Sequence, residues 1–115
     1  MTDLIARLSA ATEPSRRLDA EIARTEGWTG FSDYWLSPSG QQRQFHPPAY
    51  TSSIDAALTL VPEGYLWQLK RGFEATATVW SVMIDYDDQH PVPFGASMRP
   101  AIALCIAALR ARGVG

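Results

Sequence analysis

The densest cluster of chemically versatile side chains lies between residues 85 and 90, where the sequence reads Asp-Tyr-Asp-Asp-Gln-His. On a strand, Asp85 and Asp87 would point to the same face, because side chains alternate along an extended chain. Asp88 and His90 could complete a set of carboxylate and imidazole ligands for a divalent metal. The same composition before a proline is also typical of a solvated turn. We prefer the turn and predict no metal or other cofactor, with the metal site as the alternative.

Cys105 and His46 are further candidates for a nucleophile and a general base. Cys105 is in phase with Met98, Ile102 and Leu109 on the apolar stripe of a predicted helix, whereas a reactive thiolate needs an electropositive, partly exposed setting. We therefore expect a buried, inert thiol. His46 precedes a proline and is typical of a surface hydrogen-bonding group. No G-x-S-x-G, P-loop or G-x-G-x-x-G motif occurs, which favours a non-enzymatic protein.

Aromatic side chains concentrate in residues 28–50, which are otherwise rich in Ser, Gly, Gln and Pro. One interpretation is that Trp28, Phe31 and Trp35 plug the open face of a sheet. The other is that several rings stay exposed beside Arg43 and bind a protein, because aromatic residues and Arg dominate binding hot spots. The candidate partner-binding residues are Phe31, Tyr34, Trp35, Arg43 and Tyr50.

Composition narrows the possible partners and the compartment. The 115 residues fit one domain, residues 1–115, and the formal net charge of -2 provides no basic field for nucleic acid or an anionic membrane. A single-stranded nucleic acid would also need more cations than Arg43 beside the rings. The longest apolar run, Ala101 to Leu109, is too short to span a bilayer. With one cysteine and no signal-peptide pattern, we expect a cytoplasmic protein.

Periodicity and turn residues predict four helices and several strands. The strands cluster in hairpins instead of alternating singly with helices, which argues against a parallel sheet. We therefore predict an α+β fold, a small antiparallel sheet of about four strands flanked by helices. The predicted elements are, in order, helices near Leu4–Ala11 and from Ser15 to Gly27, strands at Phe31–Leu36 and Gln42–Phe45 around a turn at 37–40, a third helix opened by a capping box at Ser52-Ser53-Ile54-Asp55, strands at Tyr65–Lys70 and Glu74–Ile84 joined by Arg71-Gly72, and a helix at Met98–Arg112.

Three segments carry a family resemblance. They are Glu13-Pro14-Ser15-Arg16-Arg17-Leu18-Asp19, Tyr50-Thr51-Ser52-Ser53-Ile54-Asp55-Ala56-Ala57-Leu58-Thr59-Leu60-Val61-Pro62-Glu63-Gly64 and Ala101-Ile102-Ala103-Leu104-Cys105-Ile106-Ala107-Ala108-Leu109-Arg110-Ala111-Arg112. Together they resemble the phage ABA sandwich domain family of phage and prophage proteins. The resemblance implies an α/β/α layered sandwich and supplies no catalytic residue set.

The resemblance directs the functional expectation. We expect a small, non-catalytic phage or prophage accessory protein, located in the cytoplasm of a bacterial host cell, that binds a host or phage protein. The expected partners include a component of host antiviral defence, which the protein would inhibit. Two alternatives stay open. One is a metal-dependent or ligand-binding enzyme that uses the 85–90 loop, and the other is a structural or assembly component of the virion.

The predicted C-terminal helix has a second smooth side. Ala103, Ala107 and Ala111 are spaced four apart and fall away from the main apolar stripe. Alanine is tolerated on an exposed helix face, so the strip could simply face solvent without a partner. It could also meet a neighbouring helix of this chain or of a second copy. The second-copy hypothesis is a weak two-fold homodimer through this helix.

Overall fold

The computed structural model describes residues 2–61, 65–74, 77–85, 94–97 and 99–112. These residues form helices and two three-stranded antiparallel sheets, with strand orders β1-β2-β3 and β4-β5-β6. The α+β class predicted from the sequence is confirmed, with more strands than predicted. The elements are α1 (Thr2–Ala10), α2 (Arg16–Thr25), β1 (Thr29–Gly30), β2 (Trp35–Leu36), β3 (Arg43–Gln44), α3 (Ile54–Leu58), β4 (Leu66–Glu74), β5 (Ala77–Asp85), β6 (Phe94–Ser97) and α4 (Pro100–Ala111).

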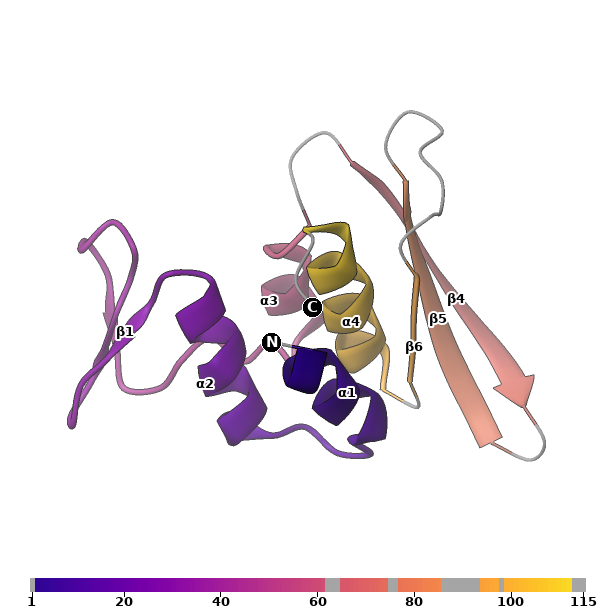
Figure 1. The fold of residues 1–115 in the computed structure, drawn as a ribbon, viewed down its shortest axis with the longest axis horizontal. Helices are drawn as coiled ribbons and strands as arrows, with labels where there is room; N and C mark the ends of the chain where they lie inside the picture. The colour runs from indigo at the N-terminus through magenta and orange to yellow at the C-terminus, as the bar shows by residue number, and fades with distance from the viewer. Residues whose placement is uncertain (1, 62–64, 75–76, 86–93, 98, 113–115) are drawn as a thin grey trace.

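The two sheets lie on opposite sides of the helices (Figure 1). The small β1–β3 sheet adjoins α2, and the larger β4–β6 sheet packs on α4, with α1 and α3 between. This layering differs from the expected α/β/α sandwich, in which one sheet lies between helices. On the larger sheet Val82 and Ile84 are buried towards α4, whereas Met83 projects from the opposite face and is 45% exposed.

Helix α4 is the centre of the core. Every residue from Ala101 to Leu109 is buried, which explains why this helix is apolar on all sides. The predicted burial of Cys105 is confirmed: its Sγ donates a hydrogen bond to the Tyr50 carbonyl oxygen at 3.2 Å. Burial raises the pKa of this thiol far above its ordinary value, so it stays protonated and unreactive.

The alanine strip of α4 is covered by strand β6. At Gly95 on this strand, an added Cβ would lie 2.6 Å from the Ala107 backbone nitrogen, so the strand approaches the helix at backbone distance. Ala103 and Ala107 are fully buried as a result. The surface that the homodimer hypothesis required is therefore inside the chain. The sequence pattern indicated no strand between Ile84 and Met98, so the strand that covers the strip was not predicted.

The connection between β4 and β5 lies at a different place from the one predicted. The expected connection at Arg71 and Gly72 is wrong, because both residues lie inside β4 and Gly72 pairs with Val79. Pairing continues to Glu74, which faces Ala77. In the sequence, a glycine inside a long strand has the same local pattern as a turn, but Gly72 is a strand residue.

Hydrogen bonds from short polar side chains fix the helix starts. Ser15 caps α2 by accepting from the Leu18 amide at 3.2 Å. The cap of α3 is Ser53, which accepts from the Ala56 amide at 3.2 Å, so the helix begins one residue later than a box starting at Ser52 would place it. Each cap satisfies an amide that the helix itself leaves free.

Candidate interaction surface

The small sheet follows directly from the way α2 ends. Gly27 has a φ of 93°, and the Trp28 amide donates to the Ala23 carbonyl oxygen at 2.9 Å. This is the Schellman type of helix end, which needs a left-handed residue and turns the chain away from the helix axis. The next two residues form β1, which pairs with β2. The small sheet is thereby held at one end of the molecule, beyond α2 (Figure 1).

Strands β2 and β3 form the hairpin that the sequence predicted, although the strands are shorter than expected. The Gly40 amide donates to the Ser37 carbonyl oxygen at 2.9 Å, which closes the turn. The Ser37 hydroxyl accepts from the Gln42 amide at 3.1 Å. Gly40 has a φ of 77°, a conformation that glycine adopts without strain. The hairpin sets the spacing between the side chains of β3 and the rings that precede β2.

Three side chains of this region form a stack. The rings of Phe31 and Tyr34 lie 4.8 Å apart between centroids with an interplanar angle of 22°. The Arg43 guanidinium carbon lies 4.8 Å from the Tyr34 ring centroid, within the range of a cation–π contact. Phe31 is 48% exposed and nearby Phe45 is 86% exposed. We call Phe31, Tyr34, Arg43 and Phe45 the aromatic surface.

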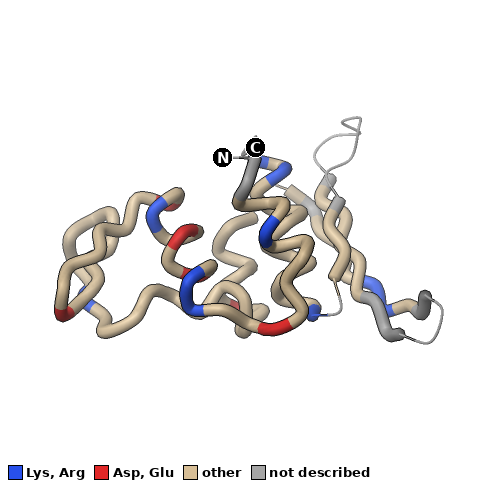
Figure 2. Tube along the Cα trace, turned by 60° about the horizontal axis from the view of Figure 1, so that its bottom comes forward, with Lys and Arg blue, Asp and Glu red and all other residues tan. Residues whose placement is uncertain are grey.

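A shallow hollow of about 320 Å³ lies on the aromatic surface, and Asp33, Tyr34, Arg43 and Phe45 contribute to its walls. Between residues 27 and 54, Asp33 and Arg43 are the sole residues of types Asp, Glu, Lys or Arg. Figure 2 accordingly shows this end of the molecule as almost entirely uncharged. The hollow thus combines exposed rings with one charge of each sign.

The other two predicted binding residues lie elsewhere. Trp35 is half-buried, with the Arg24 guanidinium carbon 5.2 Å from its ring centroid and Gly30 so close that a Cβ there would lie 2.9 Å from the ring. Tyr50 is 3% exposed, and burial raises the pKa of its hydroxyl to about 12. Its assignment to a binding surface is therefore wrong, because Tyr50 packs into the core beside Cys105.

Phe45 is the member of the surface that was not among the predicted binding residues. The available signal was its position two residues after Arg43, since alternate residues of an extended chain share a face. The aromatic side chains of this region are thus not all in one environment. Tyr50 is buried in the core, whereas Phe31 and Phe45 are exposed to solvent.

The metal alternative falls largely beyond the described structure. Asp85 is the last residue of β5, and Asp87, Asp88 and His90 lie outside the described residues. Among the residues that are described, no three His, Cys, Asp or Glu side chains gather closely enough to hold a metal ion. In that same part of the chain, no helix has the length and apolarity to cross a bilayer.

Comparison of the chain with protein-family models, curated proteins and solved structures finds no match. The aromatic surface is therefore the feature of this chain that bears most directly on function.

Proposed function

We propose that this protein has no catalytic role and acts by binding a protein partner on its aromatic surface. The observation that carries the proposal is the Phe31–Tyr34–Arg43 stack beside a phenylalanine that is 86% exposed. Exposing Phe45 brings no benefit to folding, whereas burying it against a partner contributes about 1.5–3 kcal/mol. Aromatic residues and Arg are the types in which binding energy concentrates.

The geometry favours an apolar partner segment with a single acidic residue. The Arg43 guanidinium already rests on Tyr34, so less side-chain freedom is lost when it binds a carboxylate. Asp33 in the same hollow disfavours a strongly acidic partner. The resemblance to phage ABA sandwich proteins supports a host or phage protein as the partner, including a component of antiviral defence. The enzyme and virion alternatives lack a supporting observation among the described residues.

The test is affinity capture from bacterial host lysate with three forms of the full chain. Wild type and Met83→Ser should capture the same protein, because Met83 is 45% exposed but lies on the other sheet. The double variant Arg43→Ala/Phe45→Ser should lose it. Equal capture by all three forms would place the binding elsewhere on the chain.

A further inference from the structure

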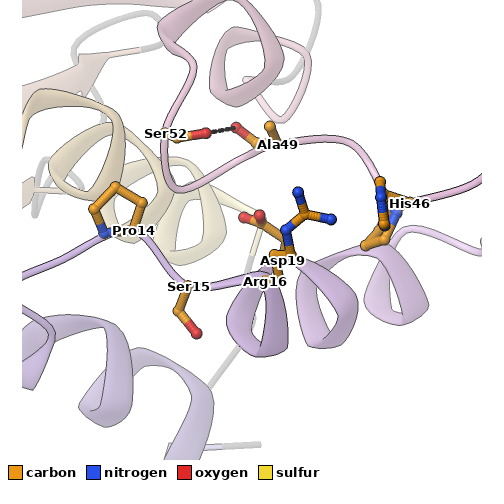
Figure 3. A pocket seen from close by; sticks show the side chains of 8 residues that line it. Pro14, Ser15, Arg16, Asp19, His46, Ala49 and Ser52 are labelled. Atoms are coloured by element: carbon orange, nitrogen blue, oxygen red, sulfur yellow. Dashed lines mark hydrogen bonds between the residues drawn. The ribbon is translucent and has the colours of Figure 1, made fainter.

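A second hollow, of about 360 Å³, lies between the start of α2 and the segment 46–52 (Figure 3). Its lining includes Arg16, Asp19 and His46, and it shares no residue with the hollow on the aromatic surface. A volume of this size suits a small organic molecule. Nothing in the proposed function uses this site.

Asp19 supplies a buried carboxylate to this hollow. It is 5% exposed, and its Oδ1 accepts hydrogen bonds from the Thr51 amide at 2.7 Å and the Thr51 hydroxyl at 2.8 Å. Both bonds end on the same oxygen, which leaves Oδ2 able to accept from a further donor. Burial raises the pKa of Asp19 in spite of these bonds and the nearby Arg16 charge. A hydrogen bond from a ligand to Oδ2 would therefore stabilise the ionised form of a carboxylate that the fold partly removes from water.

Arg16 and His46 supply donors at the edge of the same hollow. Both side chains are exposed, and Figure 3 shows Arg16 beside Asp19, pointing from α2 towards the segment that carries His46. Arg16 forms none of the ion pairs seen among the described residues, although its charge lowers the pKa of the neighbouring Asp19. Its exposed guanidinium can form charge-assisted hydrogen bonds to a carboxylate or phosphate. The hollow thus offers an acceptor at Asp19 and donors for an anion at Arg16 and His46.

The walls of the hollow are partly apolar and are held in place by hydrogen bonds. Pro14 and Pro47 are among the residues that line it. The Ser15 amide donates to the Thr51 hydroxyl at 2.9 Å, and that hydroxyl donates to Asp19. These bonds join the two segments that form the hollow, so the site exists before any ligand arrives. Preformed walls reduce the ordering cost of binding.

We propose that this hollow binds a small molecule that combines an anionic group, an N–H donor and an apolar or ring-shaped body. The anion pairs with Arg16 and accepts a hydrogen bond from His46, and the N–H group donates to Asp19. Nucleoside monophosphates and short peptides both have this chemistry. They are the two sources that the experiment separates.

Calorimetric titration of the full chain tests the proposal with three probe sets. The probes are the four ribonucleoside 5′-monophosphates, a set of dipeptides, and inorganic phosphate alone. Saturable binding of members of one organic set, with a dissociation constant below about 1 mM, is the expected result and identifies the source. No binding in either set, or equally tight binding of inorganic phosphate, would overturn the proposal.

Matched variants locate the binding. Arg16→Gln and Asp19→Asn should each weaken it by about tenfold or more, because one removes the cation and the other replaces an acceptor with a donor. Arg17→Gln is the control, since Arg17 is an exposed neighbour on α2 that does not line the hollow. Arg16 is itself exposed, so its variant keeps the test valid even if Asp19→Asn fails to fold. Binding that all three variants leave unchanged would contradict the proposal.

Discussion

Arg43 rests on the face of Tyr34, with its guanidinium carbon 4.8 Å from the ring centroid, at an end of the molecule that is almost uncharged. This contact joins β3 to the residue that precedes β2, so it orders the side chain that the proposed partner would meet. The contact lies at the surface, where a cation–π pair contributes about 0.5–1 kcal/mol. We therefore expect the contact to affect the proposed binding more than the stability of the fold.

Replacing Arg43 should separate these two consequences. We expect Arg43→Ala to lower the free energy of unfolding by no more than about 1 kcal/mol and to weaken partner binding by about 2 kcal/mol. Urea unfolding and calorimetry with the captured partner measure the two quantities. Arg17→Ala, on the exposed side of α2, is the control. A variant that loses stability and binding in equal measure would make Arg43 a structural residue only.

Gly95 should tolerate no side chain. Its added Cβ would meet backbone and side-chain atoms of α4, including the Ile106 Cβ at 3.0 Å. We expect Gly95→Ala to lower the free energy of unfolding by about 1–3 kcal/mol, the scale of overpacking, whereas Ala96→Val on the opposite face should change it little.

Ala107→Glu should prevent folding because it places a charge against β6. A folded, monomeric Ala107→Glu protein would contradict this account of the core.

Glu26 and Arg112 give a pH-dependent contribution to stability. Glu26 Oε1 lies 3.0 Å from Arg112 Nη1, and Oε2 is buried without a hydrogen-bond partner among the described residues. Burial raises the pKa of Glu26 above its ordinary 4.5, more than the Arg112 charge lowers it. The folded protein thus holds this proton more tightly than the unfolded chain. The resulting stabilisation is complete below pH 4.5 and is lost as pH rises through the raised pKa.

Two variants test the sign of this contribution. Glu26→Gln should keep or increase the free energy of unfolding at pH 7 and flatten its rise on acidification. Arg112→Leu should lower it at pH 7, because a partly buried carboxylate then loses its counter-charge. Urea unfolding between pH 4 and pH 8 is the measurement. If Glu26→Gln destabilises the protein at pH 7 as much as Arg112→Leu does, the ion pair stabilises the fold by more than its desolvation costs. The predicted direction of the pH dependence would then be wrong.

Cys105 should behave as a buried spectator. Its side chain is fully buried, and burial raises its pKa. Thiol reagents should therefore modify it at the rate of global unfolding, and Cys105→Ala should fold with a modest loss from the removed sulfur. Mass spectrometry of native and urea-unfolded protein follows the labelling. Rapid modification of the native chain at neutral pH would contradict the buried position.

Local sequence signals predicted elements whose pattern is strong. The helical spacing of apolar residues indicated α1, α2 and α4, and the turn at Ser37 to Gly40 indicated the small hairpin. The same signals failed where tertiary contacts decide. Strand β6 is four residues long and lies in a segment rich in proline, so nothing local marked it. Gly72 was misjudged because a glycine between two apolar runs has the same local pattern in a turn and in a strand.

The sequence predicted the residue types of the candidate surface, but not all of the residues that form it. The sequence brought Phe31, Tyr34 and Arg43 into one hypothesis, and the structure stacks them. It gave no sign that Tyr50 would be buried, because that burial depends on α4, which lies more than fifty residues further along the chain. The hollow at Asp19 was missed for the same reason, since Asp19 and Thr51 meet only in the folded chain.

Whether the aromatic surface holds the partner can be tested by the affinity of Phe45→Ser for the purified partner, measured by calorimetry beside wild type and Met83→Ser. Phe45 is 86% exposed and Met83 is 45% exposed, so neither substitution should alter the fold. Our account predicts that Phe45→Ser weakens binding by about tenfold or more and that Met83→Ser leaves it unchanged. Wild-type affinity in the Phe45→Ser protein would contradict the proposal that the aromatic surface holds the partner.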